Sequence, residues 1–234
     1  MPKRFGIGMF VLCAGLFGSA RPALAQQTFN FTFGYFSVRG EDARVENDII
    51  NTNRSDFAFD VEEFSSASLG GEWLVPLGQY LEAGAGVAFS RRTVPSVYQA
   101  LVQPDGSEIE QEFRLRIVPM SFTVRVLPLG QSSGFQPYFG GGLGIFNWRY
   151  SESGEFVDRN SVIFRDSFVS SGNETGGIAI AGVRFAGDSL SVGGEVRYQT
   201  ADASLGSTFA GITEPRIDLG GWTYQATVGV RFGR

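Results

Sequence analysis

The clearest pattern in the chain is an eleven-residue alternation near its C-terminus. From 222 to 232, Trp222, Phe232 and the apolar residues between them share one parity, and polar or small residues such as Thr223 and Arg231 take the other. A period of two indicates a strand with two unlike faces. Ten steps of ~3.3 Å, tilted by about 40°, span roughly 25 Å, the height of the apolar band of an outer-membrane barrel. The pattern therefore predicts a transmembrane β-strand.

The same alternation divides the rest of the chain, giving eight segments in all. They cover 28–39, 59–75, a third segment from Tyr80 onward, 110–127, 137–150, 176–186, 190–200 and 220–232. The connections after the second, fourth and sixth segments are short, whereas 40–57, 151–174 and 201–218 are long and polar. Bacterial barrels have short periplasmic turns and long external loops. We therefore expect an all-β, eight-stranded antiparallel up-and-down transmembrane β-barrel with both chain ends in the periplasm.

The third and fourth segments have two peculiarities. Residues 96–103 and 108–113 enclose a turn at 104–107, which predicts a hairpin that protrudes beyond the membrane. Apolar residues of the fourth segment occupy odd positions before Pro119 and even positions after it. Because proline cannot donate to a closed strand ladder, we predict a β-bulge at Val118 and Pro119. That bulge would turn Arg114 and Arg116 into the lumen.

The first 25 residues are typical of a cleaved signal peptide. A basic start at Lys3 and Arg4 precedes an apolar run over 5–18 and a small-residue cleavage site that ends at Ala25. The apolar run is short for a membrane-spanning helix. We expect export to the outer membrane and a mature chain, 26–234, that is a single barrel domain. Cys13, the only cysteine, lies in the segment that is removed.

Charge and composition exclude several function classes. Without Lys3, Arg4 and Arg21 the chain keeps 16 basic residues, all arginine, against 24 acidic ones, a net charge of −8. This balance argues against a nucleic-acid partner. The absence of histidine and of a mature cysteine excludes Ser–His–carboxylate and Cys–His catalysis and histidine-bound metals. The acidic loop residues lack calcium-loop spacing. We expect no enzymatic activity, no catalytic residues, no cofactor and no metal.

Charged residues within the strands predict a polar lumen. Arginine on the lipid face at mid-depth costs about 2–4 kcal/mol, so these side chains should point inward. An eight-stranded barrel is barely wide enough for its own side chains, which favours a plug of paired charges over a narrow water-filled pore. The expected network comprises Glu72, Glu82, Arg125, Arg184, Glu195, Arg197 and Arg231. Aromatic belts at the two membrane interfaces are expected from Tyr35, Trp73, Tyr80, Tyr138, Trp148, Tyr198 and Trp222.

The signal segment, the glycine- and aromatic-rich hairpins and the terminal strand resemble the small bacterial outer-membrane β-barrel proteins of the OmpA-barrel, OmpX and OmpW type. The resemblance covers essentially the whole mature chain. It implies that the terminal strand, through Tyr224, Val228, Val230 and Phe232, is read by the barrel assembly machinery. This chain departs from that pattern, because Gly233 and Arg234 follow the terminal aromatic residue.

Two functions follow from the resemblance and the loops. The first is a structural or surface-interaction role for a monomer in outer-membrane lipid, with a surface protein or small-molecule ligand as partner. Apolar patches in the loops motivate it, although they could equally be internal packing: 97–98, 101–102, 162–164 and 168–169. The second is a narrow porin or an OmpW-like passage for small molecules.

Overall fold

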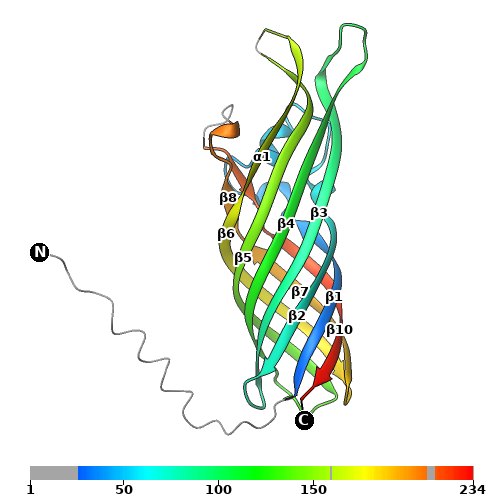
Figure 1. Cartoon of the computed structure of the whole chain (residues 1–234), viewed down its shortest axis with the longest axis vertical. Helices are drawn as coiled ribbons and strands as arrows, with labels where there is room; N and C mark the ends of the chain where they lie inside the picture. The colour runs from blue at the N-terminus through cyan, green and yellow to red at the C-terminus, as the bar shows by residue number, and fades with distance from the viewer. Residues whose placement is uncertain (1–25, 159, 210–213, 234) are drawn as a thin grey trace, which may run out of the picture.

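The chain folds into one closed ring of eight antiparallel strands (Figure 1). This computed structural model describes residues 26–158, 160–209 and 214–233, so the expected signal peptide lies outside the described residues. The ring order is β1-β10-β7-β6-β5-β4-β3-β2, closed by pairing of β1 with β2. The predicted fold class is confirmed. The strands are β1 (Gln27–Val38), β2 (Ser66–Pro76), β3 (Leu81–Val102), β4 (Glu108–Val126), β5 (Phe135–Val157), β6 (Ile163–Ala186), β7 (Leu190–Thr200) and β10 (Gly221–Phe232).

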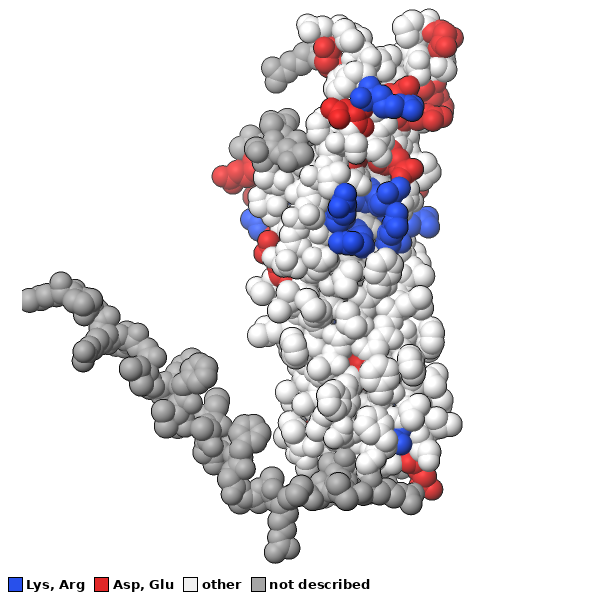
Figure 2. Space-filling view, in the orientation of Figure 1, with Lys and Arg blue, Asp and Glu red and all other residues white. Residues whose placement is uncertain are grey.

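Alternation gives the lower barrel an apolar outside and a polar inside. In β1, Phe31 and Phe33 are about half exposed, whereas the intervening Thr32 is buried. The terminal strand follows the same rule, and Tyr224, Val228, Val230 and Phe232 all lie on its exposed face. Figure 2 shows the result on one face of the molecule, a broad and largely uncharged band over this part of the barrel. Such a band is what a barrel needs in order to sit in hydrocarbon.

Among the described residues, no helix is long and apolar enough to cross a membrane.

The short turns lie together at one end of the barrel, where β1 begins and β10 ends (Figure 1). The β2–β3 and β4–β5 turns are neighbours, because the backbone amide of Gln131 donates to the backbone carbonyl of Gln79 over 2.9 Å. Gly78 and Gly130 have φ angles of +98° and +72°, which only glycine adopts readily. The predicted short-turn end therefore exists as a compact surface.

Two hairpins protrude at the opposite end (Figure 1). The β3–β4 extension was predicted, but β5 and β6 extend as well, and they pair as far as Val157 and Ile163. The prediction of a long loop at 151–174 is thus wrong. Serines and glycines occupy much of this stretch, so it carries no apolar period that would reveal a strand. We call the four-stranded extension, 91–102, 108–117, 147–157 and 163–174, the wall.

The predicted bulge at Pro119 does not exist. Val87 pairs with Met120, and Ser90 pairs with Ile117 in the same register, so nothing is inserted between them. The β3–β4 ladder only skips the pairs opposite Val118 and Pro119, which accommodates the missing N–H group, and its register shift lies at Val97 and Val102 instead.

What changes at Pro119 is the surroundings of the strand. Odd-numbered residues of β4 face inward on both sides of the proline. Below it the outside is the apolar band. Above it the apolar residues, such as Phe113 and Leu115, are buried inside the barrel mouth. Arg114 and Arg116 therefore face outward, and their predicted place in the lumen is wrong.

The barrel mouth is filled by the connection between β1 and β2, which we call loop 1 (39–65). It contains η2 (Glu41–Ala43), α1 (Ile49–Asn53) and η3 (Val61–Phe64). The predicted strand over 59–75 therefore begins only at Ser66. Residues 59–65 serve as a plug instead, since Val61 and Phe64 are buried. The connection from β7 to β10 contains the small elements β8 (Asp202–Ser204), η4 (Gly206–Phe209) and β9 (Arg216–Asp218).

Candidate functional site: the lumen

Arg125 on β4 is the centre of the lower lumen. Its side chain is fully buried and pairs with Glu72 of β2 and with Glu195 of β7, the latter over 2.8 Å. A third carboxylate, Glu82 of β3, lies 3.8 Å from Nη1. The guanidinium also stacks over the Tyr138 ring, 4.7 Å from its centroid. One arginine thus joins strands from around the ring across the lumen.

Two further arginines complete this network. Arg184 of β6 donates to both oxygens of Glu82, over 3.1 and 2.7 Å, and to the Gln136 amide oxygen. Arg197 of β7 lies 3.0 Å from Glu195 and 3.4 Å from Glu72. Six of the seven predicted lumen charges are therefore brought together, as three guanidinium groups and three carboxylates.

Arg231 is the exception. It lies at the short-turn end, where its guanidinium donates to the Gly187 carbonyl, and within the described chain no carboxylate lies within 4.0 Å of it. Sequence reasoning also missed the neutral partners of the network. Glu195 accepts hydrogen bonds from the Tyr138 hydroxyl over 3.1 Å and from the Gln225 side-chain amide over 2.9 Å. The Ser121 hydroxyl accepts from Arg197. The inward parity of these residues is the only signal that could have found them.

The balance of charge decides what this network can do. Each buried ion costs several kcal/mol to desolvate, and only well-formed pairs with further hydrogen bonds offset that cost. Here three positive and three negative side chains share contacts, so the group carries no net charge. The network joins β2, β3, β4, β6 and β7 across the lumen. It offers no single-sign surface that would attract a permeating ion.

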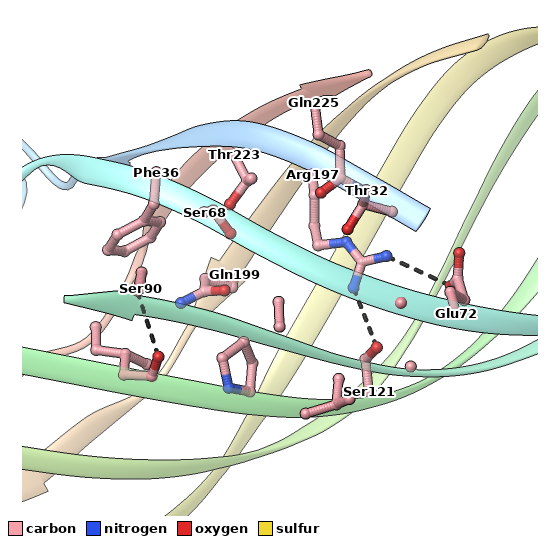
Figure 3. A pocket seen from close by; sticks show the side chains of 16 residues that line it. Thr32, Phe36, Ser68, Glu72, Ser90, Ser121, Arg197, Gln199, Thr223 and Gln225 are labelled. Atoms are coloured by element: carbon pink, nitrogen blue, oxygen red, sulfur yellow. Dashed lines mark hydrogen bonds and ion pairs between the residues drawn. The ribbon is translucent and has the colours of Figure 1, made fainter. Parts of the chain in front are cut away.

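A small polar pocket lies above the charged layer (Figure 3). Arg197, Glu72, Ser121, Gln199 and Thr223 are among the side chains that line it. Its volume is about 20 Å³, and a cavity needs roughly 10–15 Å³ to hold one water. The pocket therefore has room for about one water molecule.

The next layer up is apolar. Inward residues of the upper strands, including Ile117, Phe146 and Trp148, are buried against the plug residues Ile50 and Phe64 of loop 1. Phe59 contacts both sides, with ring centroids 5.6 Å from Phe64 and 5.1 Å from Phe113. The upper lumen is thus packed like the core of a soluble domain.

Polar contacts fasten loop 1 to the connection between β7 and β10. Arg44 pairs with Asp48 over 2.7 Å, and Asp48 also accepts the backbone amide of Asp218 on β9. Arg39 pairs with the Asp218 carboxylate over 2.9 Å. The Arg44–Asp48 pair is fully buried and the Arg39–Asp218 pair is partly buried, so both help to order the loop.

A buried carboxyl group lies beside the plug. Glu152 of β5 accepts hydrogen bonds from the Asn53 amide, over 2.6 Å, and from the Tyr150 hydroxyl, over 2.9 Å. Removal from water raises the pKa of Glu152 above its ordinary value, although both hydrogen bonds act in the opposite direction. Burial likewise raises the pKa of the Tyr150 hydroxyl. These residues lie above the apolar band, outside the membrane-spanning segments.

The Glu152→Gln substitution is expected to stabilise the protein at pH 8 and to change little near pH 4. The pKa of Glu152 is raised in the folded state. The stabilising contribution of this carboxyl group is therefore full below its pKa in the unfolded chain, and it is lost as the pH rises through its pKa in the folded protein. Denaturant midpoints at the two pH values measure this. The exposed Glu108→Gln is the matched control, and equal effects of the two substitutions at pH 8 would contradict the prediction.

The predicted aromatic belts are only partly on the outer surface. Tyr35, Trp73, Tyr80 and Trp222 are about half exposed. Tyr198 packs against Trp222 with ring centroids 4.6 Å apart. Tyr138 and Trp148 are buried inside instead, so their placement in the belts is wrong. Strand β5 has aromatic residues on both parities, which is why its sequence does not reveal the lipid-facing side.

The closed ring, the apolar outer band and the polar, charge-paired lumen define a small transmembrane β-barrel of eight strands. This is the fold that the resemblance to small bacterial outer-membrane barrels implies.

Solved structures with a similar fold are outer-membrane and surface proteins of bacteria. The N-terminal β-barrel domain of Pseudomonas aeruginosa OprF is 12% identical, with 88% of this chain and 97% of that chain covered and a TM-score of 0.40. Neisserial surface protein A is 10% identical, with 88% and 97% covered and a TM-score of 0.44. Ail of Yersinia pestis is 11% identical, with 88% and 99% covered and a TM-score of 0.39. No protein-family model and no curated protein sequence matches the chain.

Proposed function

We propose that the protein is a non-enzymatic, integral outer-membrane barrel that is closed to solutes and presents the wall outside the cell as an interaction surface. The observation that carries the proposal is the filling of the lumen by two successive layers. Charged pairs occupy the lower layer, and the apolar packing of loop 1 occupies the upper one. A barrel filled in this way serves as an anchor for what protrudes from it.

The wall is the part that an outside partner would meet. Its concave side is covered, because the amide of Ala58 in loop 1 donates to the Val97 carbonyl of β3 over 3.0 Å and Tyr98 packs against Phe57. Its tips carry exposed apolar side chains, among them Leu101 at 43%, Val102 at 63% and Val162 at 56%. The apolar patches predicted from the loops therefore have two different roles. Tyr98 packs inside the protein, and the apolar residues at the tips of the wall are available to a surface partner.

A narrow passage for small molecules is the second candidate, because the lumen contains a polar pocket. Its volume of about 20 Å³ favours a trapped water over a transport path. Assembly by the barrel assembly machinery through the terminal strand stays a prediction, as does the monomeric state.

Cysteine labelling on intact cells tests where the wall lies. The mature chain has no cysteine of its own, so Ser107→Cys at the β3–β4 tip and Ser189→Cys at the β6–β7 turn each provide one thiol. A membrane-impermeant maleimide should label Ser107→Cys on intact cells. It should label Ser189→Cys only after the outer membrane is permeabilised. Labelling of Ser189→Cys alone on intact cells would overturn the proposed orientation.

A further inference from the structure

Three arginines form a row across the outside of the wall, at its base. Arg91 of β3 is directly opposite Arg116 of β4, and Arg116 is directly opposite Arg149 of β5. Arg114 lies two residues further up the same face of β4. Figure 2 shows basic side chains gathered directly above the uncharged band. We call these four residues the arginine patch.

The row of Arg91, Arg116 and Arg149 lacks compensating charge. Among the described residues, no carboxylate lies within 4.0 Å of Arg91, Arg116 or Arg149, whereas Arg114 pairs with Glu112. The Arg116 guanidinium donates to the Asn147 amide oxygen, and its buried Nε has no partner. Like charges directly opposite on neighbouring strands are destabilising. A row of three arginines in an otherwise acidic chain therefore indicates that the row binds an anion that the protein itself does not supply.

The height of the patch indicates where that anion is. The outward row four residues below it is Val87, Met120 and Ile145, all of them exposed and apolar. Four residues at ~3.3 Å, on strands tilted by about 40°, rise roughly 10 Å along the membrane normal. Arginine side chains reach toward such an interface with their stems along apolar surface. The guanidinium groups thus lie at the level of the lipid headgroups.

The shape and chemistry of the patch suit phosphate. The four arginines line a hollow of about 340 Å³ together with Ser151, Ser153 and Ser167. Guanidinium groups bind phosphate oxygens through paired, charge-assisted hydrogen bonds, and hydroxyl groups add further donors. Among the residues that the structure describes, no carboxylate lines this hollow.

We propose that the arginine patch is a binding site for the phosphate groups of a membrane lipid headgroup, and that it holds one annular lipid against the outside of β3, β4 and β5. The proposal shares with the proposed function only the premise that the apolar band lies in a bilayer. It does not depend on which side of the membrane the wall faces.

The test compares two triple variants with equal loss of charge. Arg91→Gln, Arg116→Gln and Arg149→Gln remove the row. Arg54→Gln, Arg165→Gln and Arg216→Gln remove three arginines of the extramembrane region that pair with carboxylates. Binding of dioleoyl phosphatidic acid is titrated by native mass spectrometry of each barrel in zwitterionic detergent, with dioleoyl phosphatidylcholine as the neutral lipid. Both triple variants must retain the heat-modifiable electrophoretic mobility of a folded barrel.

We expect the wild type and the control variant to bind phosphatidic acid at least tenfold more tightly than phosphatidylcholine, and the row variant to lose that preference. An undiminished preference in the row variant, or an equal loss in the control variant, would overturn the proposal. Displacement of the lipid by an equal concentration of inorganic pyrophosphate would assign the patch to a soluble anion instead. The cysteine-labelling result is independent of all these outcomes.

Discussion

Replacement of Arg125 by methionine is expected to lower the free energy of unfolding by about 3–5 kcal/mol. The loss arises because three buried carboxylates would share only two arginines. Glu72 and Glu195 would keep only Arg197, and Glu82 would keep only Arg184. Denaturant titration of the barrel in lipid vesicles at neutral pH measures this change.

Two comparisons separate this effect from loss of side-chain packing. Arg231→Met removes an inward-facing arginine that has no carboxylate partner among the described residues, and its effect should stay below about 1 kcal/mol. Adding Glu72→Gln to Arg125→Met should recover much of the loss, since Glu195 then keeps Arg197 and Glu82 keeps Arg184, and the charges balance again. Equal destabilisation by Arg125→Met and Arg231→Met would contradict the central place of Arg125 in the network.

The lower barrel is largely predictable from sequence because the two sides of each strand meet different media. Lipid outside and polar lumen inside impose a period of two, which gave the ends of β7 correctly and those of β1 and β10 to within one residue. The same parity selected the six charges that meet in the lumen. Parity could not exclude Arg231 from the network, because it predicts which face of a strand a residue lies on and not how far along the barrel axis the residue lies.

Above the membrane the same rule fails, for an identifiable reason. Water lies outside and the apolar plug of loop 1 lies inside, so apolar side chains move to the opposite parity without any change of register. Phe113 and Leu115 suggested a bulge at Pro119 for this reason. Loop 1 itself shows only scattered apolar residues, such as Ile49 and Ile50, and nothing local indicates that they fold back into the barrel.

A closed lumen predicts that the wild-type protein does not conduct ions. The polar pocket has room for about one water, with the charge-balanced network below it and buried aromatic side chains above it. The Arg231→Ser variant should also stay closed, because Arg231 stands outside the network. Arg125→Ser should remain closed as well, since the apolar layer is intact in that variant.

Planar-bilayer recording of the refolded wild-type barrel measures directly whether the lumen is closed to ions. Insertion is verified separately by protection from added protease, and a general porin recorded in the same membranes provides the positive control. We expect no steady current at any applied voltage for the wild type. A reproducible unitary conductance from the inserted wild-type barrel would show that solutes pass the two layers, and would contradict a closed lumen.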